Sequence, residues 1–178
     1  MESSTNQRVA IVTGSSTGIG YETSIALARD GFLTYATMRN LNKAEGIKSA
    51  ANKENLPIRT KQLDVTDDMS VKNAVQTISS ETGGRIDVLV NNAGYVLGGA
   101  FEDLAMDEIK TQYETNFFGL IRTTHAVLPI MREQKSGVIV NVSSGAGRFG
   151  YPGHSAYIST KFAVEGLSES MSYELEPF

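Results

Sequence analysis

Short apolar runs alternate along the chain with longer stretches in which apolar residues recur at helical spacing. This alternation is typical of βα units wound onto a parallel sheet. The apolar runs predict five strands, at residues 8–13, 33–37, 59–65, 86–91 and 137–142. Because the first, fourth and fifth runs are rich in Val and Ile without strict alternation, we expect them to be central strands covered on both faces.

The stretches between these strands predict helices at residues 19–30, 41–54, 67–82, 106–135 and 155–175. In the third helix, Val71, Val75 and Ile78 share one face. Pro129 is expected to kink the fourth helix near its end. Together the elements predict an α/β fold: a Rossmann-like, doubly wound parallel sheet in the strand order 3-2-1-4-5, with helices on both faces.

Residues 1–178 contain no internal repeat, low-complexity tract or linker, so we interpret them as a single domain. In a parallel sheet each helix returns the chain to lay down another strand. The last predicted element is a helix that ends shortly before Phe178. We therefore expect a fold that is incomplete at its C-terminus.

The net charge of the chain is −4, from 16 Lys and Arg residues against 20 Asp and Glu residues. No basic cluster interrupts this acidic balance, so nucleic acid is not an expected partner. No apolar run exceeds four residues, so we expect no membrane partner and a cytoplasmic protein. Because the chain has no Cys and only two His, no metal site is expected, and hydroxyls, amides, carboxylates and amines must supply the chemistry.

A glycine-rich turn, TGSSTGIG at residues 13–20, follows the first predicted strand directly and leads into a helix. In a dinucleotide-binding turn, Gly14 permits the tight bend, Gly18 lets backbone N–H groups approach a pyrophosphate, and Gly20 allows close helix packing. Three such glycines also occur in ordinary turns, but the order of strand, turn and helix favours a dinucleotide ligand. The other turn residues expected to contact that ligand are Ser16, Thr17 and Ile19.

The end of the second strand carries Arg39, about twenty residues beyond the glycine turn, where dinucleotide-binding folds meet the adenosine ribose. No carboxylate stands there to accept a hydrogen bond from a ribose 2′-hydroxyl. The guanidinium of Arg39 could instead bind a 2′-phosphate in bidentate fashion. We therefore predict NADP(H) as the preferred cofactor. NAD(H) is the alternative if Arg39 is only a solvated residue at a strand end.

Tyr157 and Lys161 lie one helical turn apart near the start of the last predicted helix. An ammonium about 5 Å from a phenol stabilises the ionised phenol by about 3 kcal/mol at an effective dielectric constant of about 20. Such a pairing would suit Tyr157 to donate or take a proton. The same spacing is common on exposed helix surfaces, so the assignment depends on the neighbourhood of the pair.

Polar residues that follow two of the predicted strands supply that neighbourhood. The fifth strand runs into NVSS at residues 141–144, and ligands of open parallel sheets bind outside the carboxyl ends of the strands. Ser144 is therefore expected to hydrogen-bond a carbonyl that Tyr157 protonates, with Ser143 as the alternative. At the same edge we interpret NNAG, residues 91–94, mainly as scaffold beside the cofactor.

Asn116 lies in the middle of the long predicted helix at residues 106–135. Asn is a weak helix former, and nothing local explains its presence there. A polar role in the site is one interpretation, and an exposed helix residue is the other.

Taken together, these motifs resemble those of the classical short-chain dehydrogenase/reductase family, in the family's order and over essentially the whole chain. The resemblance implies that Tyr157 is the general acid/base, that Lys161 assists it and binds the nicotinamide ribose, and that Ser144 orients the carbonyl or alcohol. It also implies that Asn116 holds a water linking Lys161 to solvent.

The same resemblance implies further cofactor contacts, at Asp64, Val65, Asn91, Ala93 and Gly94. The segment at residues 35–40 is most similar to NADP-preferring hydroxysteroid and retinoid members of the family. Thr17 departs from the basic residue that many NADP-dependent members carry before their second glycine, so the cofactor preference rests on Arg39. Family members also continue into further strands and a substrate lid, which we expect this chain to lack.

The leading hypothesis is an oxidoreductase that moves a hydride between NADP(H) and a small secondary alcohol or carbonyl compound. The alternative is a non-catalytic dinucleotide-binding or sensing module of the same fold. An epimerase or dehydratase is disfavoured by the glycine spacing and the NNAG segment. The resemblance and the two long helices predict a homo-dimer or tetramer.

Overall fold

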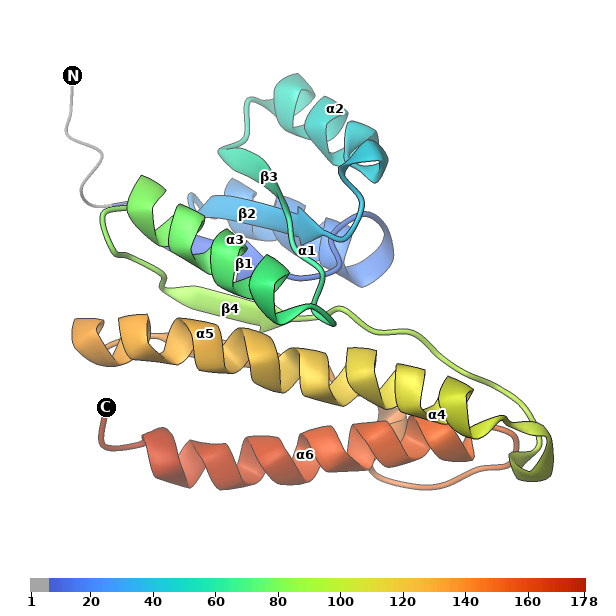
Figure 1. Cartoon of the computed structure of the whole chain (residues 1–178). Helices are drawn as coiled ribbons and strands as arrows, with labels where there is room; N and C mark the ends of the chain where they lie inside the picture. The colour runs from blue at the N-terminus through green and yellow to red at the C-terminus, as the bar shows by residue number, and fades with distance from the viewer. Residues whose placement is uncertain (1–6) are drawn as a thin grey trace, which may run out of the picture.

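The computed structural model describes residues 7–178, in which five parallel strands form one sheet (Figure 1). The strands are β1 (Val9–Val12), β2 (Leu33–Met38), β3 (Ile58–Gln62), β4 (Val88–Asn91) and β5 (Val138–Asn141). Their order is β3-β2-β1-β4-β5, which confirms the predicted topology. The strand order therefore reverses between β1 and β4, where folds of this kind place their ligand crevice.

The α-helices cover both faces of the sheet, as predicted, with α3 and α5 on one face and α1 on the other (Figure 1). Their bounds are α1 (Gly18–Arg29), α2 (Glu45–Glu54), α3 (Asp68–Glu81), α4 (Met106–Tyr113), α5 (Gly119–Gln134) and α6 (Ser155–Leu175). The predicted helix at residues 155–175 is confirmed at both ends.

Two predicted helices are interrupted. The segment predicted as one helix at residues 106–135 is α4 and α5, joined by a π-helical turn at Glu114–Phe118. Pro129 lies inside α5, which continues to Gln134. The segment predicted at residues 41–54 begins with a 3₁₀ turn at Leu41–Lys43, because the Asn40 side chain accepts the N–H of Asn42 and tightens the entry.

Strand β3 ends earlier than the predicted residue 65 because local side-chain hydrogen bonds turn the chain toward α3. The N–H of Asp64 donates to Ser70 Oγ at 2.9 Å, and the Asp64 carboxylate accepts the N–H of Thr66 at 3.0 Å. These bonds satisfy backbone groups that the sheet no longer pairs.

The apolar core is divided by the sheet into two clusters. On the side of α3 and α5, Ile11, Tyr35 and Leu89 pack against Ile78 and Val127. On the other side, Ala36 and Met38 pack with residues of α1 and α2. Tyr35 and Ala36 point to opposite clusters because successive side chains of a strand alternate between faces.

β5 departs from the prediction that it is a central strand. It is an edge strand of the described sheet, and the Val138 and Val140 side chains are 54% and 43% exposed. The run of branched apolar residues therefore marks a strand that is covered on one face only within residues 7–178.

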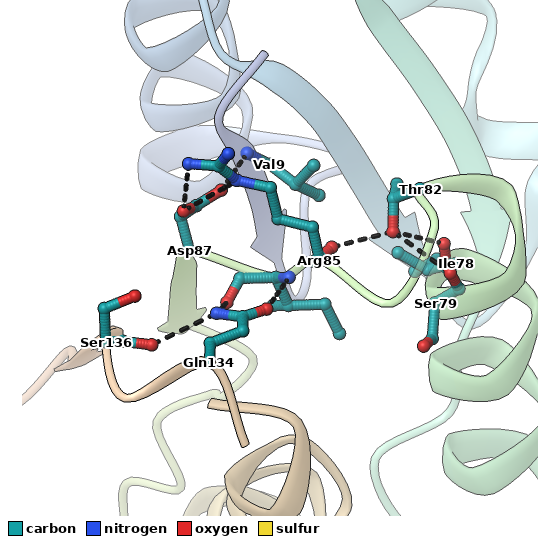
Figure 2. A network of polar contacts seen from close by, with 9 residues as sticks. Val9, Ile78, Ser79, Thr82, Arg85, Asp87, Gln134 and Ser136 are labelled. Carbon is teal, nitrogen blue, oxygen red and sulfur yellow. Dashed lines mark hydrogen bonds and ion pairs between the residues drawn. The ribbon is translucent and has the colours of Figure 1, made fainter. Parts of the chain in front are cut away.

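A polar network braces the sheet at the amino ends of its strands (Figure 2). Asp87 accepts the N–H of Val9 at 2.7 Å and is held by the guanidinium of Arg85. Burial alone would raise the pKa of Asp87, but the Arg85 and Val9 bonds more than offset it and lower that pKa. The Gln134 side chain binds both backbone groups of Ile86, at 2.7 and 2.9 Å, and so joins α5 to the approach of β4.

Candidate active site

A cavity of about 850 Å³ opens at the carboxyl ends of β1, β2 and β4, the opposite end of the sheet from this network. This volume lies within the range of small-molecule and cofactor sites. Most of the residues predicted to bind a cofactor line it: Gly14, Ser16, Thr17, Gly18, Ile19, Arg39, Asp64, Val65, Ala93, Gly94, Tyr157 and Lys161. The topology therefore brings together residues that are far apart in the sequence.

The glycine turn has the backbone geometry that a close approach requires. Gly18 has a φ of +61°, and a Cβ on it would meet no atom within 4 Å, so the backbone faces open space. Gly20 does not line the cavity; it is buried, and a Cβ there would overlap the Asn92 side chain and the Gly14 carbonyl oxygen. Gly20 thus acts through close packing of α1 against the turn.

The NNAG segment braces the turn from β4, in agreement with its interpretation as scaffold. Thr13 Oγ1 accepts the N–H groups of Asn92 and Ala93, both at 3.0 Å. The Asn92 amide in turn donates to the carbonyl oxygens of Thr13 and Gly14 at 2.8 and 3.2 Å. These four bonds fix the glycine turn to the neighbouring strand.

Asn91 lies elsewhere than the resemblance implied. Its side chain is 4% exposed, does not line the cavity, and donates to Thr124 Oγ1 at 3.0 Å and to Asn141 Oδ1 at 2.9 Å. The Thr123 hydroxyl also donates to the side-chain amide oxygen Oδ1 of Asn91. Because every polar atom of this side chain is engaged, Asn91 ties β4 to β5 and α5 beneath the cavity.

The N-terminus of α1 forms an electropositive part of the cavity lining. The first turn of α1 carries no acidic residue, and the N-cap Thr17 makes no side-chain capping bond. The unpaired N–H groups and the dipole of such a terminus favour an anionic ligand. Among residues 7–178, Asp64 is the single carboxylate in the cavity lining, and its carboxylate accepts both the N–H and the hydroxyl of Thr66.

Tyr157 and Lys161 project from the first two turns of α6 into the cavity. The Lys161 ammonium nitrogen lies 5.8 Å from the centroid of the Tyr157 ring and donates to the Val142 carbonyl oxygen at 2.8 Å. Lys161 is 7% exposed, and this burial lowers its pKa. Lys161 is therefore enclosed and Tyr157 is half-buried, in contrast to a solvated pair on a helix surface.

The two serines after β5 have different surroundings. Ser144 is half-buried, caps the 3₁₀ turn Gly145–Gly147 by accepting the N–H of Ala146 at 3.1 Å, and does not line the cavity. Ser143 lines the cavity, but its hydroxyl is buried without a partner among the described residues. That hydroxyl would lie 2.8 Å from a Cβ on Gly147.

Asn116 is 2% exposed, so the interpretation as an exposed helix residue is wrong. It lies in the π-helical turn, where its side chain binds both backbone groups of Tyr95, accepting the N–H at 3.0 Å and donating to the oxygen at 2.9 Å. Gln112, one turn earlier, donates to the same oxygen at 3.1 Å. Asn116 thus holds the segment after β4, which carries the cavity-lining residues Tyr95 and Val96.

Several residues of the lining escaped the sequence analysis. Tyr95 and Val96 follow the NNAG segment, where no pattern distinguishes them from an ordinary loop. Lys43 also lines the cavity. The sequence feature that could have indicated a place for Lys43 in the lining is its position four residues after Arg39, on the helix predicted at residues 41–54.

A doubly wound parallel sheet with a glycine turn and a cavity at its switch point defines a nucleotide-binding protein of the Rossmann type. The family model described as short chain dehydrogenase matches residues 8–178. The chain belongs to the short-chain dehydrogenase family.

Similar proteins include the uncharacterised oxidoreductase YusZ of Bacillus subtilis, 43% identical over 97% of this chain and 61% of the relative. The 3-ketodihydrosphingosine reductase of Bacteroides thetaiotaomicron is 40% identical over 96% of this chain and 60% of its own length. A crystal structure of an actinorhodin polyketide ketoreductase with NADPH superposes with a TM-score of 0.92 at 30% identity, covering 98% of this chain and 67% of that one. The chain thus spans about three fifths of the curated relatives.

None of the helices within residues 7–178 combines the length and the apolar character needed to cross a bilayer.

Proposed function

We propose that the chain is the cofactor-binding and catalytic part of an NADP(H)-dependent oxidoreductase that interconverts a secondary alcohol and a carbonyl compound. The observation that carries this proposal is the meeting of the glycine turn, Arg39, Tyr157 and Lys161 around one cavity. The family of the chain and the printed names of its oxidoreductase relatives support it, as does the NADPH in the related ketoreductase.

The residues of the cavity suit a phosphorylated dinucleotide. The open backbone at Gly18 and the acid-free N-terminus of α1 would receive the pyrophosphate. Arg39, exposed at the end of β2, would meet the adenosine ribose and its 2′-phosphate. Lys161 uses one of its three N–H donors on Val142, which leaves two for ribose hydroxyls.

The nicotinamide, when bound, supplies or accepts the hydride. Tyr157 handles the proton: in carbonyl reduction its hydroxyl donates to the carbonyl oxygen, and in alcohol oxidation it takes the alcohol proton. The Lys161 ammonium stabilises the ionised phenol that remains after donation. One of the two serines after β5 would donate to the substrate oxygen. The Ser144 oxygen accepts the N–H of Ala146, which leaves its O–H available, and the Ser143 hydroxyl in the cavity lining has no partner among the described residues.

The substrate would approach past the segment that Asn116 holds. Tyr95 and Val96 line the cavity and are 40% and 55% exposed, which presents apolar surface to an entering molecule. An alcohol or ketone with an apolar body fits this entrance. The water-holding role of Asn116 remains a prediction.

Titration calorimetry with NADPH and NADH tests the cofactor assignment. The parent chain is expected to bind NADPH more tightly, and Arg39→Asp should abolish or reverse the preference by removing a charge-assisted pair worth about 1.5–3 kcal/mol. Lys48→Asp is the matched control, because it makes the same charge change at an exposed position outside the cavity. Equal affinities in the parent chain would refute NADP(H) preference, and absence of binding to both would refute the proposed function.

A further inference from the structure

Arg122, on α5, is hydrogen-bonded to two segments of the chain that line the cavity. Its Nη1 donates to the Val65 carbonyl oxygen at 2.6 Å, and its Nη2 donates to Glu114 Oε1, also at 2.6 Å. Val65 lies in the connection between β3 and α3, and Glu114 begins the π-helical turn. The Arg122 Nε also bonds to Asp68, the first residue of α3. One side chain therefore joins α5, the π-helical turn and the β3–α3 connection.

Both of these segments contribute side chains to the cavity lining. The lining includes three residues of the β3–α3 connection and two of α4 and the π-helical turn: Asp64, Val65, Thr66, Thr111 and Thr115. Arg122 itself does not line the cavity. Its bonds therefore hold the two segments from outside the cavity and leave the space for a ligand free.

Packing at Val65 fixes the same connection a second time. Gly119, the first residue of α5, comes so close that a Cβ on it would lie 2.7 Å from Val65 Cγ2 and 3.2 Å from the Val65 carbonyl oxygen. Val65 is buried. Its side chain is thus held by contact with Gly119 and its carbonyl group by Arg122, so α5 determines the position of the β3–α3 connection.

The contacts of Arg122 differ from those of an isolated surface ion pair. The side chain is 21% exposed, and a carbonyl oxygen and two carboxylates accept from it. A planar guanidinium can serve several acceptors in fixed directions, which a lysine ammonium does less well. Because β3 ends at Gln62, no strand pairing holds the connection that follows. Without the guanidinium, a ligand would have to order this connection on binding.

We infer that Arg122 is a positioning residue for cofactor binding, which fixes the β3–α3 connection relative to the π-helical turn. This inference rests on the proposed function. A cavity whose lining is already in place spares the ligand the cost of ordering it. Arg122 acts on the shape of the cavity and brings no charge into it. Its removal should therefore weaken NADPH and NADH binding alike, in contrast to the removal of Arg39.

The test is titration calorimetry of Arg122→Met with NADPH and NADH, at a temperature at which circular dichroism shows the variant folded. Both cofactors should bind about tenfold more weakly, with the ratio of their affinities unchanged. Arg122→Lys keeps the charge without the planar fork and should show intermediate affinities. Glu114→Ala should weaken binding in the parent chain and add no loss in Arg122→Met, where its partner is already absent.

Arg59→Met is the matched control. Arg59 also joins β3 to α3, since its Nη1 donates to Glu81 Oε2 at 3.1 Å. This bond lies near the amino end of β3 and at the last residue of α3, away from the cavity lining. The control should therefore lower the free energy of unfolding and leave both cofactor affinities unchanged.

Parent-like affinities in Arg122→Met, or an equal loss in Arg59→Met, would overturn the inference while the proposed function stands. A changed ratio of NADPH to NADH affinity in Arg122→Met would also overturn it, because Arg122 would then act through its charge. If Arg122→Met does not fold, Arg122→Lys decides, and parent-like binding of both cofactors would contradict the inference. If neither cofactor binds the parent chain, the proposed function fails and the inference fails with it.

Discussion

Lys161 occupies an environment that a purely structural lysine would not need. It is almost fully buried, and no carboxylate of the described chain pairs with it. Burying an ammonium without a counter-charge costs free energy, and that cost appears here as a lowered pKa. A buried cation beside a phenol in the lining of a cavity is the arrangement expected of a site that handles a proton.

Tyr157→Phe tests the role of the phenol. The substitution keeps the ring and removes the transferable proton, so we expect ketone reduction to fall by at least about 10²-fold while NADPH affinity is retained. Turnover followed by NADPH absorbance, together with calorimetric binding, measures both quantities. Near-normal turnover in this variant would end the proposed mechanism.

Lys161→Met serves as the contrasting variant. It fills a similar volume without the charge, so both NADPH binding and turnover should decrease. A loss of turnover alone would restrict Lys161 to assisting Tyr157, without a contact to the cofactor.

At the scale of elements, a second network joins β2, β3 and α3 away from the site. The buried Tyr35 hydroxyl donates to Glu81 at 2.8 Å, and the ammonium of Lys61 donates to the other carboxylate oxygen at 2.9 Å. The bonds from Lys61 and Tyr35 lower the pKa of Glu81 to about 2. Burial, reinforced by the bond to Glu81, raises the pKa of Tyr35 to about 12.

This network predicts a loss of stability in acid. The pKa of Glu81 is depressed on folding, so the stabilisation is present above about pH 4.5 and is lost as the pH falls toward 2. Because the Glu81 side chain is 33% exposed, solvent screening reduces the contribution to about 1 kcal/mol. Urea unfolding should show Glu81→Gln less stable than the parent by that amount at neutral pH.

The difference between Glu81→Gln and the parent should shrink as the buffer is taken from about pH 5 to about pH 3. Glu102→Gln, at an exposed position without an ion pair among the described residues, should show no such pH dependence. A difference that stays constant over the whole range would show that the carboxylate charge of Glu81 does not stabilise the fold.

At the scale of the whole molecule, aromatic side chains remain exposed on the helices beside the site. Phe118, in the π-helical turn, and Phe162, on α6, are each 46% exposed. The edge strand β5 adds Val138 and Val140 on a different surface. Exposed apolar surface of this kind favours association.

We therefore predict that the 178-residue chain forms a homo-dimer or tetramer through the helical surface of α5 and α6. Phe162→Glu should shift it toward monomer, as measured by size-exclusion chromatography with light scattering. Val138→Glu distinguishes this surface from the edge of the sheet, since it should leave the helical interface intact. A parent chain that is monomeric at micromolar concentration would contradict this prediction. The cytoplasmic location is a separate prediction.

The sequence by itself determined the order of the elements and the strand order, because hydrophobic periodicity and the handedness of βα units are local or general rules. It also located the glycine turn, Arg39, Tyr157 and Lys161. Tyr157 and Lys161 lie one helical turn apart, and Arg39 follows the glycine turn at the spacing of one βα unit, so both relations can be recognised from local sequence. Tertiary structure alone decided that Asn116 is buried against Tyr95, that Asn91 lies beneath the cavity, and that Lys43 joins Arg39 in its lining. These outcomes depend on contacts between residues distant in sequence, and periodicity contains no information about which distant surfaces meet.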